Sequence, residues 1–203
     1  MRKLFVTGIG TDIGKTIVSA ILVEKLKTDY WKPIQSGGLE HTDTMKVKAL
    51  VSNPMSVFYP ESYRLTQPLS PHHSAGLDGI QIEKERIVLP QSQNDTLVIE
   101  GAGGLMVPLN NQYLVIDIAE DLGAEIILVS KAYLGSINHS LLSIEAIKQR
   151  KLPLLGIIFN GVPNPESEKV ILEYSGVRCL GRIPQAEELN RDFVIRCGTL
   201  IEI

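Results

Sequence analysis

The sequence has few cysteines, no surplus of basic residues and no long hydrophobic run. Its two cysteines, Cys179 and Cys197, can form one bridge at most and show neither a CxxC nor a zinc spacing, which favours a reduced, cytoplasmic protein. A formal net charge of −3 leaves no basic excess to neutralise a nucleic-acid backbone. Apolar runs such as Ile126–Val129 and Leu154–Phe159 are far shorter than the roughly 20 residues that span a bilayer, so we expect them to be buried strands.

The 203 residues contain no internal repeat, low-complexity tract or linker. This length is typical of one globular domain, so we expect a single domain over residues 1–203. Strand-like and helix-like segments alternate, which favours a mostly parallel sheet flanked by helices. We expect strands at residues 4–7, 30–34, 97–100, 125–130, 154–159 and 178–183, then a short tail, whereas the pattern at residues 56–65 is ambiguous. We expect helices at residues 16–26, 44–51, 83–89, 114–122, 136–150 and 166–174.

The most informative segment is the glycine-rich turn between the first predicted strand and helix, which reads GIGTDIGKT over Gly8–Thr16. In such a turn, amide N–H groups point toward an anion and the helix N-terminus adds positive potential. Lys15 can reach the β- and γ-phosphates of a nucleotide, and the Thr16 hydroxyl can coordinate Mg²⁺. A chance GKT at a helix start is the alternative, but the flanking elements and glycines agree. The sequence therefore predicts nucleotide binding by an α/β, P-loop NTPase-like, three-layer domain.

Other polar residues stand at the ends of predicted strands. Lys32, Glu100 and Asn160 each end or nearly end one, and ligands of open parallel sheets gather at the carboxyl ends of strands. Glu100 has the position expected of a magnesium carboxylate, although a solvent-facing acid is the alternative. Asp43 lies at or near a predicted helix start and suits either a metal ligand or an N-cap. We expect Lys32, Glu100 and Asn160 to share the edge of the sheet that holds the phosphate loop.

Five segments occur in the order found in dethiobiotin synthetase, and the chain resembles that family from its first residues to about Gln185. They read GIGTDIGKT (Gly8–Thr16), WKPIQSG (Trp31–Gly37), SPH (Ser70–His72), EGAGG (Glu100–Gly104) and LGSINH (Leu134–His139). The first is shared with many ATPases, but its combination with KPIQSG and EGAGG is much more specific. The resemblance implies ATP- and Mg²⁺-dependent ring closure in biotin synthesis. In that reaction 7,8-diaminononanoate and CO₂ form a carbamate, ATP converts it to a carbamic-phosphoric anhydride, and the second amine closes the ring of dethiobiotin.

The resemblance also implies roles for individual residues. Those that act on the reacting groups are Lys32, Lys15 and Thr11, and the metal ligands are Thr16, Asp43 and Glu100. The nucleotide contacts are Asp12, Ile13, Gly14, Lys15, Thr16, Ile17, Asp43, Glu100, Gly101, Ala102, Gly103, Asn160, Gly161, Ile183, Pro184 and Gln185. The substrate contacts are Ser36, Gly135, Ser136, Ile137 and Asn138. In the family the last four come from the second subunit of a homodimer, which places the substrate site at the interface.

Each of these residues also has an ordinary structural interpretation. Lys32 suits a solvated lysine at a strand end, and Ser36 suits a turn. The segment at residues 135–138 suits a capping turn, and Asn160-Gly161 is a common turn pair. No NKxD sequence is present to specify guanine, so ATP is favoured as the nucleotide.

Three other classes share parts of this pattern. Partition-type ATPases, which switch by dimerising on ATP, usually carry a second lysine early in the loop, where this chain has Gly10. Many dethiobiotin synthetases have Asp or Glu at that position, so Gly10 departs from both patterns. Amidation domains of cobyrinate-type enzymes normally precede a glutaminase domain. A nucleotide-sensing module without catalysis would not need Lys32, Asp43 and Glu100 together.

Overall fold

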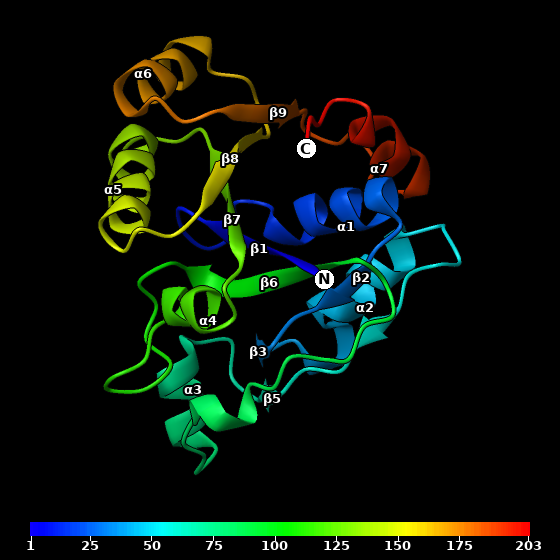
Figure 1. Ribbon diagram of the computed structural model, residues 1–203, viewed down its shortest axis with the longest axis vertical. Helices are drawn as coiled ribbons and strands as arrows, with labels where there is room; N and C mark the ends of the chain where they lie inside the picture. Colours follow the sequence, from blue (N-terminus) through cyan, green and yellow to red (C-terminus); the bar gives the residue numbers. More distant parts are fainter.

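A seven-stranded sheet forms the centre of the protein in the computed structural model, which describes residues 1–203 (Figure 1). Its strands are β1 (Arg2–Gly8), β2 (Asp29–Trp31), β4 (Phe58–Tyr59), β6 (Thr96–Gly104), β7 (Glu125–Lys131), β8 (Leu154–Asn160) and β9 (Cys179–Ile183). They lie in the order β4-β2-β6-β1-β7-β8-β9, and every neighbouring pair is parallel. The strands β3 (Ile34–Ser36) and β5 (Tyr63–Leu65) form a separate parallel pair.

Helices cover both faces of the central sheet. They are α1 (Lys15–Leu26), α2 (Asp43–Leu50), α3 (Pro71–Leu77), α4 (Val115–Asp121), α5 (Ser136–Gln149), α6 (Pro165–Ser175) and α7 (Arg191–Gly198). Buried residues of α1, α2 and α7 pack on one face, and those of α4, α5 and α6 pack on the other (Figure 1). The predicted α/β three-layer architecture is therefore confirmed.

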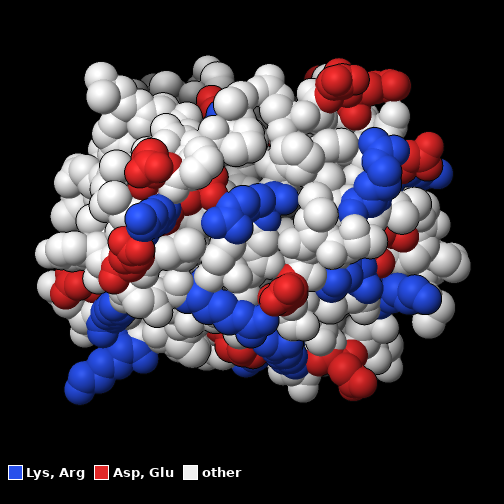
Figure 2. Space-filling model, turned by 90° about the horizontal axis from the view of Figure 1, so that it is seen from above, with Lys and Arg blue, Asp and Glu red and all other residues white.

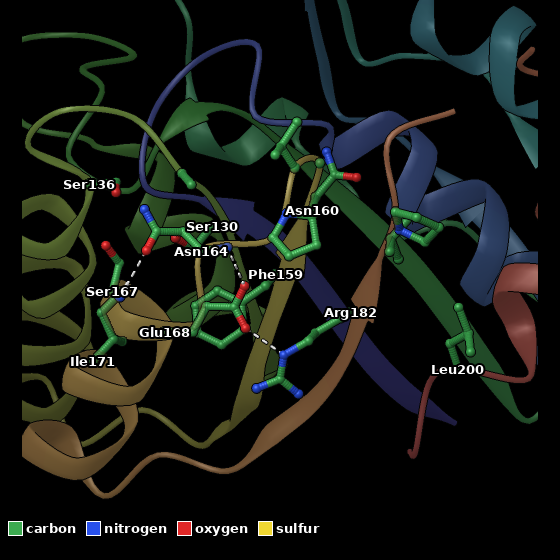
Figure 3. Close-up of a pocket in the computed structure, with 16 residues that line it drawn as sticks. Ser130, Ser136, Phe159, Asn160, Asn164, Ser167, Glu168, Ile171, Arg182 and Leu200 are labelled. Atoms are coloured by element: carbon green, nitrogen blue, oxygen red, sulfur yellow. Dashed lines mark hydrogen bonds and ion pairs between the residues drawn. The ribbon is translucent and has the colours of Figure 1, made fainter. Parts of the chain in front are cut away.

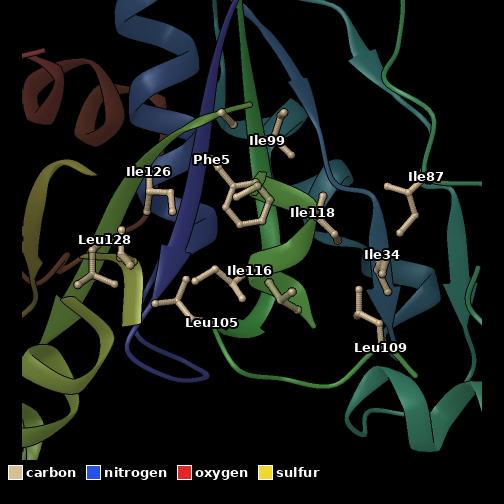
Figure 4. Close-up of a cluster of buried hydrophobic side chains, with 14 of the residues drawn as sticks. Phe5, Ile34, Ile87, Ile99, Leu105, Leu109, Ile116, Ile118, Ile126 and Leu128 are labelled. Atoms are coloured by element: carbon tan, nitrogen blue, oxygen red, sulfur yellow. The ribbon is translucent and has the colours of Figure 1, made fainter. Parts of the chain in front are cut away.

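The two hydrophobic clusters follow from the alternation of side chains along the strands. In β1, Leu4 and Val6 belong to the cluster beneath α1, whereas Phe5 belongs to the cluster beneath α4 (Figure 4). Because both faces of the sheet are covered, the segment Ile126–Val129 is wholly buried, as its continuous apolar sequence predicts. None of the helices is long and apolar enough to cross a membrane. Lys and Arg side chains lie among Asp and Glu side chains on the face shown in Figure 2.

Three predicted elements differ from the structure. The strand expected at residues 30–34 is divided into β2 and β3, because Pro33 cannot donate a ladder hydrogen bond and the chain leaves the main sheet there. The helix expected at residues 83–89 is wrong: only a 3₁₀ turn, Lys84–Arg86, forms. Its charged residues are exposed, and Pro90 follows closely. The strand expected to end at Glu100 continues to Gly104 as β6.

Two short helices were not expected. The predicted tail contains α7, in which the Asn190 side chain accepts a hydrogen bond from the Phe193 amide at 2.9 Å. This helix packs on α1, where the ammonium of Lys25 donates to the Gly198 carbonyl at 2.8 Å. Helix α3 begins at the SPH segment, and the ambiguous residues 56–65 contain β4 and β5. Short helices of this kind are stabilised by tertiary packing, which sequence periodicity does not show.

Candidate active site

The glycine-rich turn joins the end of β1 to the start of α1, as predicted. Gly14, immediately before the helix, has φ of 95°, a conformation that favours glycine. A Cβ at Gly14 would lie 2.1 Å from the side-chain nitrogen of Asn160. That Asn160 nitrogen donates to the Ile13 carbonyl at 2.9 Å. The end of β8 therefore fixes the turn, and only glycine fits between them.

Lys15 lies in the first turn of α1 with its side chain folded across the loop. Its ammonium donates to the Gly10 carbonyl at 2.8 Å, and only 7% of the residue is exposed. Burial lowers the pKa of Lys15 to about 8, because desolvation outweighs the attraction of Glu100 and Asp43, and the nearby charge of Lys32 lowers it further. A phosphate anion at the loop would favour the charged form of this lysine.

This pKa predicts a pH dependence of nucleotide affinity. Below about pH 7 Lys15 is already charged and binding requires no proton, whereas above the pKa of about 8 binding must take up one proton. The affinity for ATP should therefore fall as pH rises above 8, by up to about tenfold per pH unit. Calorimetry at about pH 9, in buffers of different ionisation enthalpy, should show the proton uptake. An affinity that is constant between about pH 7 and pH 9 would contradict this prediction.

A buried ion cluster lies beside the loop. The Lys32 ammonium is 2.9 Å from Glu100 Oε1 and 2.9 Å from Asp43 Oδ2. Burial alone would lower the pKa of Lys32, but the two carboxylates outweigh that effect and raise it. The Thr16 hydroxyl donates to Glu100 Oε1 at 3.0 Å. The cluster forms because β6 lies between β1 and β2 in the sheet, so that Glu100 meets Thr16, which follows β1, and Lys32, which follows β2.

The oxygen atoms of this cluster suit a hard divalent cation. Thr16, Asp43 and Glu100 offer one hydroxyl and two carboxylates, the donors that Mg²⁺ prefers. Asp43 and Glu100 contact the Lys32 ammonium, and Thr16 contacts Glu100. The chain has no group of three or more His, Cys, Asp or Glu residues arranged to hold a metal. A magnesium ion at this site would therefore rely on nucleotide phosphates and water for its remaining ligands.

Most residues predicted to contact nucleotide phosphates or substrate line one cleft of about 1100 Å³. They are Thr11, Asp12, Gly14, Lys15, Thr16, Ile17, Lys32, Ser36, Asp43, Glu100, Ala102 and Gly103. The Ser36 hydroxyl is buried and has no hydrogen-bond partner, which is consistent with a ligand contact. Ile13 and Gly101 are buried and line neither this cleft nor the pocket described below.

Several cleft residues were not predicted from the sequence. Gln35 joins two walls of the cleft: its side-chain oxygen accepts from the Asp43 amide at 3.1 Å, and its nitrogen donates to the Gly37 carbonyl at 2.9 Å. Lys46 also lines the cleft, with its ammonium 3.0 Å from Asp43 Oδ1. Gln35 belongs to the KPIQSG segment, which was a usable signal, whereas Lys46 stands three residues after Asp43 on a helix and has no motif of its own.

A second pocket of about 240 Å³ lies at the carboxyl ends of β8 and β9 (Figure 3). Its lining includes Asn160, Gly161, Ile183 and Pro184, which were predicted to contact the nucleotide base, together with Ser136. Arg182 forms an ion pair with Glu168 of α6 across the pocket in Figure 3. The remaining predicted residues, Gln185, Gly135, Ile137 and Asn138, line neither the pocket nor the cleft.

Comparison with known proteins decides the family. A family model described as AAA domain matches residues 2–192. The ATP-dependent dethiobiotin synthetase BioD of Christiangramia forsetii is 53% identical over 186 residues, 91% of this chain and 88% of that protein. The corresponding protein of Cytophaga hutchinsonii is 45% identical over 194 residues, 96% of this chain and 94% of its own. The chain belongs to the dethiobiotin synthetase family. The predicted ATP-dependent ligase is thereby confirmed as the enzyme class.

Solved structures show how widely this fold is shared. A ParA family ATPase from Chlorobium tepidum has a TM-score of 0.59 and 14% identity, with 98% of each chain covered. The septum site-determining protein MinD of Pyrococcus horikoshii, complexed with Mg-ADP, has a TM-score of 0.56 and 14% identity, covering 96% of this chain and 85% of its own. At such low identity these likenesses show the P-loop fold alone. Membership of the dethiobiotin synthetase family therefore rests on the sequence relatives.

Proposed function

We propose that this chain closes the ureido ring of dethiobiotin, joining 7,8-diaminononanoate to CO₂ with the hydrolysis of ATP to ADP and phosphate. The observation that carries this proposal is the buried Lys32 ammonium, held 2.9 Å from both Glu100 and Asp43 beside the phosphate loop. A fixed positive charge there suits a reaction in which anions form and move, and no protein nucleophile is needed.

The proposed reaction has three steps. One amine of the substrate attacks CO₂ and loses a proton, giving a carbamate anion whose charge is balanced by Lys32. A carbamate oxygen then attacks the γ-phosphorus of ATP, and the bond to ADP breaks. The second amine attacks the carbonyl carbon of this carbamic-phosphoric anhydride, loses a proton and expels phosphate as the ring closes. Lys15 holds the transferred phosphoryl group, and Thr11 contacts it from the loop.

Magnesium belongs to this proposal through the oxygen ligands of the cleft. Thr16, Asp43 and Glu100 would hold it next to the β- and γ-phosphates, and when bound it would neutralise phosphate charge. Asp43 and Glu100 both form ion pairs with Lys32, so the magnesium ion and the lysine would contact the same two carboxylates. The residues present fit this ion because their donors are a hydroxyl and two carboxylates, the oxygen ligands that Mg²⁺ prefers.

Substrate and base contacts complete the proposal. Ser36, with its buried unpartnered hydroxyl, contacts the diamine. The segment at residues 135–138 of the partner subunit binds the substrate carboxylate through amide groups at the start of α5. Within one chain this segment lies outside the cleft lining, and the adjacent Leu134 is fully exposed, which supports a role toward a second copy in a homodimer.

The nucleotide base is assigned to the edge of the sheet beyond the phosphate loop. There it would contact Asn160 and Gly161 at the end of β8 and the segment Ile183–Gln185 at the end of β9. Asn160 and Ile183 line the second pocket, which supports this assignment.

Residues 1–203 act as one domain in this proposal, and the reaction takes place in the cytoplasm.

Product analysis tests the proposed function directly. Purified protein given Mg-ATP, the diamine and ¹³C-bicarbonate should release ADP and form dethiobiotin that carries the label in its ureido carbon, as measured by mass spectrometry. Omission of the diamine should stop ADP release, because the carbamate is the phosphoryl acceptor. Steady ATP hydrolysis that ignores the diamine would instead favour a switch ATPase and contradict the proposal.

A further inference from the structure

A buried tyrosine contacts the ion cluster and has no part in the reaction proposed above. Tyr30 lies in β2 with none of its surface exposed, and its hydroxyl donates to Glu100 Oε2 at 2.9 Å. The other oxygen, Glu100 Oε1, receives the Thr16 hydroxyl and the Lys32 ammonium. The two oxygens of this buried carboxylate therefore have separate sets of partners.

The sheet explains this division. Strand β2 lies beside β6 and pairs Tyr30 with Val98, so the tyrosine ring occupies the cluster beneath α1 on the same face as Glu100. Tyr30 and Lys32 are two residues apart on one chain, and each reaches a different oxygen of Glu100. The tyrosine approaches from the core, and Lys32 and Thr16 approach from the cleft, which both of them line.

We propose that Tyr30 is a positioning residue that holds Glu100 Oε2 in the core, so that Oε1 faces Thr16, Lys32 and the magnesium ion of the proposed reaction. The inference deepens the proposed function and rests on it. Without the hydroxyl, Oε2 would be a buried carboxylate oxygen with no donor, which is costly. The carboxylate would then turn toward the donors of the cleft, and Oε1 would lose its fixed place.

The substitution Tyr30→Phe tests this inference, because it removes only the hydroxyl and keeps the aromatic ring. The centroid of that ring lies 6.3 Å from the centroid of the Phe58 ring. The measurement is the affinity for Mn²⁺ of protein loaded with a non-hydrolysable ATP analogue, read by electron paramagnetic resonance. Loss of a hydrogen-bond partner of a metal ligand typically lowers the affinity for the metal by about 10- to 100-fold. We expect a change of that size, together with a matching rise in the Mg²⁺ concentration needed for turnover. Nucleotide affinity measured in EDTA should not change.

Tyr113→Phe is the matched control. The Tyr113 hydroxyl also donates to a carboxylate, that of Asp121 at 2.8 Å, but neither residue lines the cleft. Its removal should leave the Mn²⁺ affinity unchanged. Both variants are compared at a temperature at which their melting curves show them folded.

The outcomes separate the two hypotheses. Equal Mn²⁺ affinity in Tyr30→Phe and Tyr113→Phe would overturn the positioning role and leave Tyr30 as a packing residue. A fall in nucleotide affinity in EDTA as large as the fall in Mn²⁺ affinity would also overturn it, because the loop itself would have moved. Wild-type protein that binds Mn²⁺ with nucleotide but forms no dethiobiotin would overturn the proposed function, while the comparison of the two variants would still decide the role of Tyr30.

Discussion

Replacing Lys32 by methionine is expected to lower the rate of ring closure by about 100- to 1000-fold, which is typical for the loss of one fixed group that stabilises developing charge. Methionine keeps most of the length of the side chain but removes its charge and the N–H donors of its ammonium group. Affinity for ATP should change little, because the phosphate loop and Lys15 remain in place. Turnover measured as dethiobiotin formation and ATP binding measured by calorimetry would together separate these two effects.

Lys46→Met provides the matched control for Lys32→Met. Both ammonium groups contact Asp43, at 2.9 Å and 3.0 Å, but the side chain of Lys46 is 55% exposed whereas that of Lys32 is 5% exposed. Exposed ion pairs contribute little, so Lys46→Met should leave turnover nearly unchanged. Wild-type turnover in Lys32→Met would remove Lys32 from the mechanism. An equal loss in both variants would show that neither cation beside Asp43 can replace the other, and that the buried position of Lys32 gives it no special role.

Lys32→Met should also change stability in a way that depends on bound ligand. Removal of one partner from a buried ion pair costs up to about 3–5 kcal/mol. Here the cost should fall near the lower end, because Glu100 keeps the hydroxyls of Thr16 and Tyr30 and Asp43 keeps Lys46. Magnesium with nucleotide would replace the missing positive charge and restore part of the melting temperature.

The main features of the candidate site could be predicted from the sequence because they depend on local pattern and on the rules of parallel sheets. The turn at Gly8–Thr16 is a continuous segment whose neighbours are a strand and a helix, so its geometry is encoded locally. Lys32 and Glu100 are far apart in sequence, but Lys32 directly follows β2, and Glu100 lies in the middle of the neighbouring, longer strand β6. Their 2.9 Å contact confirms the expectation that the sheet brings them together.

Other features depend on contacts that periodicity does not contain. Tyr30 has the pattern of an ordinary core aromatic residue, and only the pairing of β2 with β6 places its hydroxyl on Glu100. Helix α7 was missed because its stability comes from packing on α1. The opposite error occurred at residues 83–89, where helical spacing was present but only Ile87 became buried. In each case the deciding contact lies between elements distant in sequence.

Gly14→Ala is expected to lower the affinity for ATP by roughly 100-fold or more, because it combines two costs. An alanine held at φ of 95° is strained by about 1–3 kcal/mol, and a factor of ten in affinity corresponds to about 1.4 kcal/mol. In addition, its Cβ would lie 2.1 Å from the Asn160 side-chain nitrogen. Asn160 would have to release the Ile13 carbonyl, and the loop would lose its fixed shape. Calorimetric titration with ATP measures the loss.

Gly10→Ala in the same loop provides a stringent comparison. A Cβ at Gly10 would meet nothing closer than the Tyr133 hydroxyl at 4.0 Å, and the backbone of Gly10 does not have a positive φ. This variant should bind ATP nearly as well as the wild type, and Lys15 should still donate to the carbonyl at position 10. If both variants lost affinity equally, general stiffening of the loop would be the cause. If Gly14→Ala bound ATP normally, the contact between Asn160 and the loop would have no part in holding the phosphates.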